Sequence, residues 1–108
     1  MTVQEYLNKT RKFMKNGVRP PIYCHDGFKI SVQASAFHYC IPRKDNEEFY
    51  EKVELGFPNL KDDLIIEYAE TPDEPTKTVY GFVPIELVEK LIRKHGGIAN
   101  VPDFDMED

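Results

Sequence analysis

The feature that most constrains the fold is a strictly alternating segment, residues 28–35, which follows the dipeptide Asp26-Gly27. Asp-Gly is a favoured hairpin turn because both residues tolerate positive φ angles. Apolar residues occupy every second position of the segment: Phe28, Ile30, Val32 and Ala34. Polar residues occupy the positions between them: Lys29, Ser31, Gln33 and Ser35. This period of two predicts a strand in an antiparallel sheet with one buried face and one polar face.

Two helices are predicted from their end signals. Thr2 and Glu5 form a capping-box pattern at the start of a helix over residues 3–15. Pro84 suits the first position of a second helix, which Gly96-Gly97 ends. Together they predict one helix at each end of the chain.

The segments between these helices predict the rest of the fold. Residues 22–24, 49–57 and 78–83 have strand-like patterns. Residues 60–69 favour a helix, although periodicity fits a strand equally in so short a run. The expected order is α-β-β-β-α-β-α. It describes an α+β fold in which two or three helices pack on one face of an antiparallel sheet of about four strands.

The chain is expected to form one domain over residues 1–98, because 108 residues with 41% hydrophobic content supply a single core. The net charge of −5 is unevenly placed. Four acidic residues near the C-terminus, Asp103, Asp105, Glu107 and Asp108, leave −1 for residues 1–102. Residues 99–108 are therefore predicted to form a flexible acidic tail. A body that is near neutral argues against direct binding to duplex DNA.

The cellular setting is inferred from segments that the sequence lacks. No apolar run is long enough to cross a membrane, and the N-terminal residues do not show the basic and then apolar pattern of a signal peptide. Two cysteines are too few for a disulfide scaffold. We therefore expect a cytoplasmic protein with reduced thiols and no membrane partner.

A zinc site was considered because the chain contains thiol and imidazole groups close together in sequence. The candidate ligands are Cys24, His38 and Cys40, with His25 beside the first of them. Their spacing differs from the paired ligands of structural zinc sites, and adjacent residues on a strand face opposite sides. The preferred interpretation is that both cysteines are small buried hydrophobic residues, and no cofactor is expected.

Catalytic arrangements are weakly represented. Cys40 with His38 or His95 is a candidate nucleophile pair, but no glycine-rich turn or orienting carboxylate accompanies it in the sequence. The adjacent carboxylates Asp62-Asp63 and Asp73-Glu74 are predicted to face solvent. We therefore assign no catalytic residue and expect a protein without enzymatic activity.

A binding surface is the remaining functional hypothesis. The candidate residues combine hydrogen-bonding groups, aromatic planes and a fixed cation: Gln33, Ser35, His38, Tyr39, Arg43 and Tyr80. A tyrosine with an arginine suits stacking together with bidentate contact to a carboxylate or phosphate. Such a surface fits a partner protein or an anionic, nucleotide-like ligand. The pattern is equally typical of a structural role, in which His38 and Tyr39 cover the end of the hydrophobic core and Arg43 lies in solvent.

Five ordered strings carry a resemblance that covers most of residues 24–98. They are SVQAS-xx-HYC-x-PR (31–43), VELGFP (53–58), EYAE-x-P (67–72), PT-x-TVYGFVP (75–84) and KHGGI (94–98). Together they resemble a family of small proteins encoded by phages and prophages. The resemblance assigns no catalytic residue. What it implies is a setting, namely an accessory protein that acts in the cytosol of a bacterial host.

Within that setting the first hypothesis is a non-enzymatic protein that binds and inhibits a host factor, for example a CRISPR nuclease or another defence nuclease. Its acidic tail could occupy a basic nucleic-acid channel, in which case the attraction would weaken with salt. The first alternative is a sponge that sequesters a signalling nucleotide, in a pocket that a homo-oligomer interface could complete. The second alternative is a small zinc- or thiol-dependent enzyme.

Overall fold

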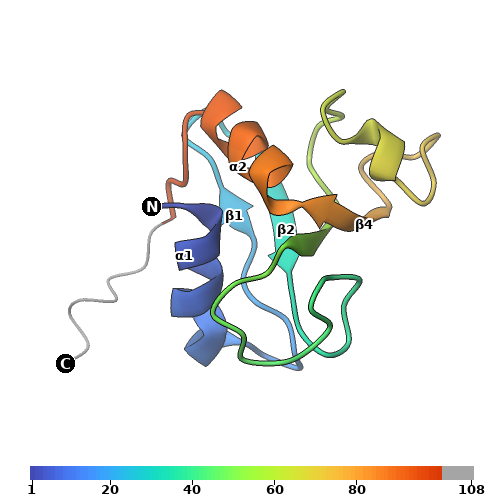
Figure 1. Ribbon diagram of the computed structural model, residues 1–108. Coiled ribbons are helices and arrows are strands. Elements are labelled where there is room, and N and C mark those ends of the chain that lie inside the picture. Colours follow the sequence, from blue (N-terminus) through green and yellow to red (C-terminus); the bar gives the residue numbers. More distant parts are fainter. Residues whose placement is uncertain (101–108) are drawn as a thin grey trace.

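A four-stranded antiparallel sheet, in the order β1-β2-β3-β4, forms the centre of the structure (Figure 1). The computed structural model describes residues 1–100. The strands are β1 (Ile22–Tyr23), β2 (Lys29–Gln33), β3 (Lys52–Gly56) and β4 (Val79–Pro84). The helices are α1 (Val3–Lys9), α2 (Ile85–Lys94) and two short 3-10 helices, η1 (Thr10–Phe13) and η2 (Ile66–Tyr68). The predicted α+β fold with an antiparallel sheet is confirmed.

The core lies between the sheet and the two α-helices. All four apolar residues of the alternating segment are buried, whereas Lys29 is exposed and Ser31 is half-buried. The helices cover this apolar face with Val3, Tyr6 and Leu7 from α1 and with Ile85, Val88, Leu91 and Ile92 from α2. The period of two therefore predicted the buried side of β2 correctly.

The two helices are joined where α1 begins. The Glu89 carboxylate of α2 accepts hydrogen bonds from the backbone N–H groups of Val3 (2.9 Å) and Gln4 (3.4 Å). The predicted capping box of Thr2 and Glu5 is present at the same end. A carboxylate at a helix N-terminus is favoured because the first N–H groups there have no partner within the helix.

The first helix is shorter than the predicted range 3–15. Its regular turns end at Lys9, and η1 follows. The buried Thr10 hydroxyl donates to the Tyr6 carbonyl oxygen (2.6 Å), which competes with the regular backbone bonding of the helix. Asn16 and Gly17 then both have positive φ angles (55° and 79°) and form the tight turn that reverses the chain.

Residues 60–69 contain only η2 instead of the favoured longer helix. The Asp62 carboxylate accepts a hydrogen bond from the Leu64 N–H (2.9 Å), so this aspartate forms a local turn in place of a helical one. Its side chain is also directed at the end of α2, as described below. The favoured helix is therefore present only as a short 3-10 helix, because apolar spacing did not reveal the turn that Asp62 forms.

Side-chain hydrogen bonds continue the edge pairing of β2 just before β1 begins. The Gln33 amide accepts from the Arg19 N–H (2.8 Å) and donates to the Arg19 carbonyl oxygen (2.9 Å). It therefore occupies the place of a backbone partner and satisfies both polar groups of the buried Arg19 backbone. The polar face of the sheet is accordingly less open at this end than the alternation predicts.

The described part of the chain ends on β1. The Ala99 N–H donates to the Tyr23 carbonyl oxygen (2.6 Å), and the Asn100 side chain bonds to Tyr23, Pro21 and Tyr6. The remainder of the predicted acidic tail, residues 101–108, lies outside the described residues. Within residues 1–100, no helix has both the length and the apolar character needed to cross a membrane.

Candidate functional site

An exposed aromatic patch lies at the bulged part of β4. We define the aromatic patch as Tyr39, Arg43 and Phe82. The rings of Tyr39 and Phe82 are tilted against each other with centroids 5.7 Å apart, and the Arg43 guanidinium carbon lies 5.4 Å from the Tyr39 ring centroid. Tyr39 is 39% exposed and Phe82 is 42% exposed. The patch therefore presents two aromatic surfaces and a cation to solvent.

A β-bulge turns Phe82 outward. On β3, Val53 pairs with Val83 and Leu55 pairs with Tyr80. One residue of β3, Glu54, therefore lies opposite two residues of β4, Gly81 and Phe82. Phe82 has a φ of 53°, in the left-handed region that aromatic residues rarely adopt. The extra residue on β4 thus changes the direction of one side chain at the sheet surface.

Hydrogen bonds at the same bulge hold Tyr39. The Tyr39 N–H donates to the Glu54 carboxylate (2.9 Å), and the Phe82 N–H donates to the Tyr39 carbonyl oxygen (3.0 Å). A Cβ atom at Gly81 would lie 3.4 Å from the Tyr39 Cβ, so this tyrosine packs directly on the glycine. These contacts hold the backbone that carries both rings.

The other four predicted binding residues lie below the surface. Gln33 is engaged at the sheet edge described above. Ser35 is buried and shares a 2.6 Å hydrogen bond with Nδ1 of the half-buried His38. Burial lowers the pKa of His38, which favours its neutral form. Tyr80 is fully buried and its hydroxyl donates to the Pro75 carbonyl oxygen. Of the six predicted residues, the structure brings Tyr39 and Arg43 together in the exposed patch.

The candidate metal ligands are not assembled. Cys24 lies beside Phe28 just before β2, whereas Cys40 donates to the Ser35 carbonyl oxygen (3.2 Å) just after β2. The five-residue strand β2 separates these ends by about 17 Å of extended chain. Among residues 1–100, no three histidine, cysteine, aspartate or glutamate side chains are placed to hold one metal ion.

Neither thiol is activated. Burial raises the pKa of Cys24 to about 11 and also raises the pKa of Cys40. A thiol attacks as its thiolate, so a raised pKa opposes the nucleophile that the sequence suggested. Both cysteines are buried, as the preferred interpretation expected.

A cluster around His95 was not predicted as a unit. The ring nitrogens Nδ1 and Nε2 lie 2.7 Å from an Asp26 carboxylate oxygen and 2.8 Å from an Asp62 carboxylate oxygen. Lys94 also bonds to both Asp62 oxygens at 3.0 Å. The cluster therefore joins the end of α2 to the hairpin turn and to the loop before η2.

The position of Asp62 corrects a sequence-based expectation. This aspartate was predicted to face solvent with its neighbour, but it is 5% exposed, whereas Asp63 is exposed. A partial signal was present in the basic pair Lys94-His95 at the end of α2, because cationic side chains can pair with carboxylates from other segments. Spacing along the chain could not show which carboxylates would reach it.

Comparisons of the chain with protein-family models, with curated proteins and with solved structures give no match.

Proposed function

We propose that the chain is a non-enzymatic protein that binds a partner protein through the aromatic patch. The observation that supports this proposal is the Tyr39–Phe82 pair, held at the surface by a bulge and accompanied by Arg43. Aromatic residues and arginine are enriched in the centres of protein interfaces, where a few side chains provide most of the binding energy. The patch has this composition.

Preorganisation strengthens the proposal. Binding normally requires the ordering of flexible side chains, at about 0.5–1.5 kcal/mol for each. Hydrogen bonds hold the backbone at Tyr39 and Phe82, the Tyr39 side chain packs on Gly81, and the two rings contact each other, so less ordering remains for binding. The left-handed backbone at Phe82 is a strained conformation of the kind that proteins retain at functional sites.

The phage resemblance suggests which partner to test first. In a bacterial host the proposed partner is a host protein that the chain inhibits, with defence nucleases as the first class to examine. Arg43 would pair with a carboxylate of that partner, because a guanidinium binds carboxylates through two parallel hydrogen bonds.

The alternatives have less support from the geometry. A nucleotide sponge could use the Tyr39 ring and Arg43, but the polar atoms of Gln33 and the Tyr80 hydroxyl are already bonded within the chain. A thiol enzyme would need an accessible thiolate, which the burial of Cys40 opposes.

The proposal is tested by recovering the tagged full chain from phage-infected bacterial cells and identifying the proteins that copurify. The dissociation constant of the recovered partner is then measured for the wild type and for Tyr39→Ala, Phe82→Ala and Phe57→Ala. We expect each patch variant to weaken binding about 30-fold, as interface hot spots do. Phe57 is the matched control, since it is exposed and has a φ of 51° but lies outside the patch.

Two results would contradict the proposal. The first is a partner whose affinity is the same for the wild type and both patch variants. The second is a nucleotide that is released from the purified chain on denaturation and is lost in Tyr39→Ala, which would favour the sponge.

A further inference from the structure

A basic groove lies where η1 and the following turn approach Arg19 and Pro20. It has a volume of about 660 Å³ and is lined by Lys12, Phe13, Met14, Lys15, Val18, Arg19 and Pro20. This volume lies within the range of about 300–1,000 Å³ that is typical of ligand sites. None of these lining residues belongs to the aromatic patch, so the groove is a separate feature.

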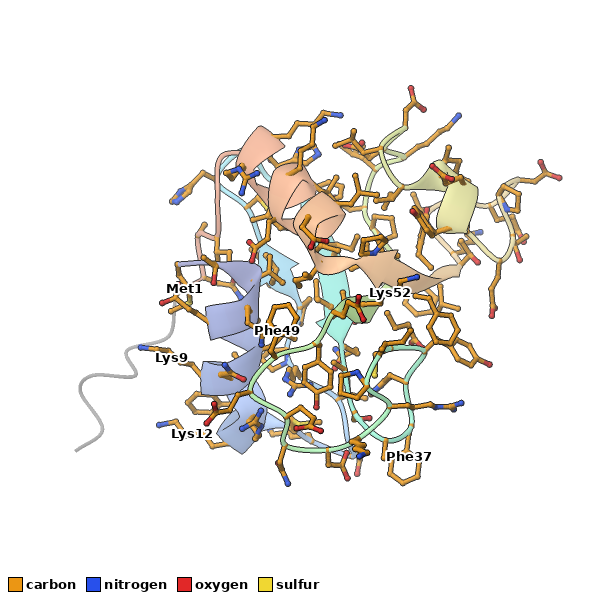
Figure 2. All side chains as sticks on the ribbon, in the orientation of Figure 1. Met1, Lys9, Lys12, Phe37, Phe49 and Lys52 are labelled. Carbon is orange, nitrogen blue, oxygen red and sulfur yellow. The ribbon has the colours of Figure 1, made fainter. Side chains whose placement is uncertain are left out.

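The groove combines apolar surface with positive charge. Phe13, Met14, Val18 and Pro20 provide the apolar surface, and Val18 is 47% exposed. The Lys12 ammonium lies 5.4 Å from the centroid of the Phe13 ring. Lys9 and Lys12 extend from the side of α1 and η1 that faces away from the sheet (Figure 2). Among the described residues that line the groove, three are basic and none is acidic. The chemistry fits a peptide that carries both carboxylates and apolar side chains.

The last described residue, Asn100, is linked to this groove through Tyr6 and Pro20. The Asn100 side chain donates to the Pro21 carbonyl oxygen (2.8 Å) and to the Tyr6 hydroxyl (3.2 Å). That hydroxyl in turn donates to the carbonyl oxygen of Pro20, which lines the groove. Eight residues follow Asn100. Extended, they reach about 27 Å.

The C-terminal sequence has the complementary composition. Residues 101–108 read VPDFDMED, in which Phe104 and Met106 alternate with Asp103, Asp105 and Glu107. We propose that this segment binds in the basic groove of its own chain, with Phe104 against the apolar surface of Met14, Val18 and Pro20 and its carboxylates beside Lys15.

Attachment to the same chain makes this binding effective. Exposed ion pairs contribute only about 0.2–1 kcal/mol each, so a free peptide of this length would bind weakly. A short tether raises the local concentration of the segment to about the millimolar range, which compensates for weak contacts. The bound segment occupies a surface that would otherwise attract acidic partners. This inference goes beyond the proposed function and does not depend on the aromatic patch.

The test uses the full chain with Phe104→Trp, because the natural sequence contains no tryptophan and the emission then reports on this one position. We expect emission at shorter wavelength than that of a free peptide of residues 101–108 with the same tryptophan. Adding Lys15→Glu should move the emission to that of the free peptide. Lys61→Glu is the control, since Lys61 is exposed, carries the same charge and lies outside the groove.

A second measurement does not depend on the folding of the Lys15 variant. Raising the salt concentration to 1 M shortens the screening length to about 3 Å and should release the segment in the chain that carries only Phe104→Trp. Emission that equals the free peptide at low salt overturns the proposal, and so does a short-wavelength emission that neither salt nor Lys15→Glu changes. A shift that grows with protein concentration also overturns it, because the segment would then bind a second copy.

Discussion

His95 and Asp62, 33 residues apart in the sequence, form a 2.8 Å contact that joins the end of α2 to the loop before η2. The His95 ring also stacks on Phe28, with centroids 3.9 Å apart and an interplanar angle of 9°. The carboxylate is almost inaccessible, with 2% of the Asp62 side chain exposed. The His95 side chain thus connects the loop before η2, through Asp62, to the apolar core, through Phe28.

Replacing the buried carboxylate should destabilise the fold. Asp62→Asn removes the charge that Lys94 and His95 share, and we expect the free energy of unfolding to fall by about 2 kcal/mol, the value of a charged hydrogen bond. Urea denaturation measures the change. Asp63→Asn is the matched control, since the Asp63 side chain is 91% exposed and its loss should change stability by less than about 0.5 kcal/mol. Equal effects of the two variants would show that the contact has no structural role.

The same cluster predicts how stability depends on pH. Burial acts to raise the pKa of the Asp62 carboxyl, but hydrogen bonds from Leu64, His95 and Lys94 outweigh it and hold this pKa below its usual value. The Phe28 N–H and His95 likewise lower the pKa of Asp26. A carboxyl with a lowered pKa in the folded state contributes stability above its unfolded pKa of about 3.9 and loses it as pH falls further.

We therefore expect the urea midpoint of the wild type to fall as pH decreases from about 5 through the folded pKa values of these carboxyls. The midpoint of Asp62→Asn should fall less over the same interval, because one of the two linked groups no longer titrates. Identical slopes for both chains would exclude Asp62 as a source of the acid sensitivity.

Two glycines have similar backbone conformations but different surroundings. Alanine substitutions at these positions can therefore separate the cost of backbone strain from the cost of steric crowding. Gly96 (φ 93°) and Gly17 (φ 79°) both lie in the left-handed region. A Cβ at Gly96 would lie 3.2 Å from the His25 Cβ, whereas a Cβ at Gly17 meets no atom within 4 Å. Gly17→Ala should cost about 1 kcal/mol from backbone strain alone, and Gly96→Ala about 2 kcal/mol or more. Thermal or urea unfolding of the two variants provides the comparison, and equal losses would mean that His25 yields freely.

The buried thiols should be unreactive while the chain is folded. With its pKa raised to about 11, Cys24 has about one thiolate in a thousand at pH 8, against about a quarter for a free cysteine. We expect alkylation by iodoacetamide to be slow at both cysteines and to become fast in urea. Fast reaction of Cys40 in the folded chain would instead revive the thiol enzyme.

The sheet and its buried face were predictable because they depend on local patterns. Alternation in residues 28–35 identifies which side chains of β2 point inward, and Thr2 with Glu5 identifies the start of α1. These signals span only a few residues. No knowledge of distant contacts is needed to interpret them.

The site was only partly predictable because it depends on contacts between distant segments. Tyr39 and Arg43 were recognised from their residue types, but Phe82 was not selected, since no local pattern shows that β4 carries a bulge opposite Glu54. Gln33 was read as a surface residue because the alternation places it on the polar face. The sequence does not show that Arg19 covers it.

The strained backbone at Phe82 allows stability and binding to be separated. Asparagine adopts positive φ more readily than phenylalanine, so Phe82→Asn should relieve strain at φ 53°. It also removes a ring that lies 5.7 Å from Tyr39 and is 42% exposed, so the loss of its partly buried surface offsets part of this relief. We expect the urea midpoint to stay level or rise by the equivalent of up to about 1 kcal/mol, while affinity for the recovered partner falls at least tenfold. A large loss of stability would mean that the aromatic pair supports the fold, and unchanged affinity would remove Phe82 from the interface.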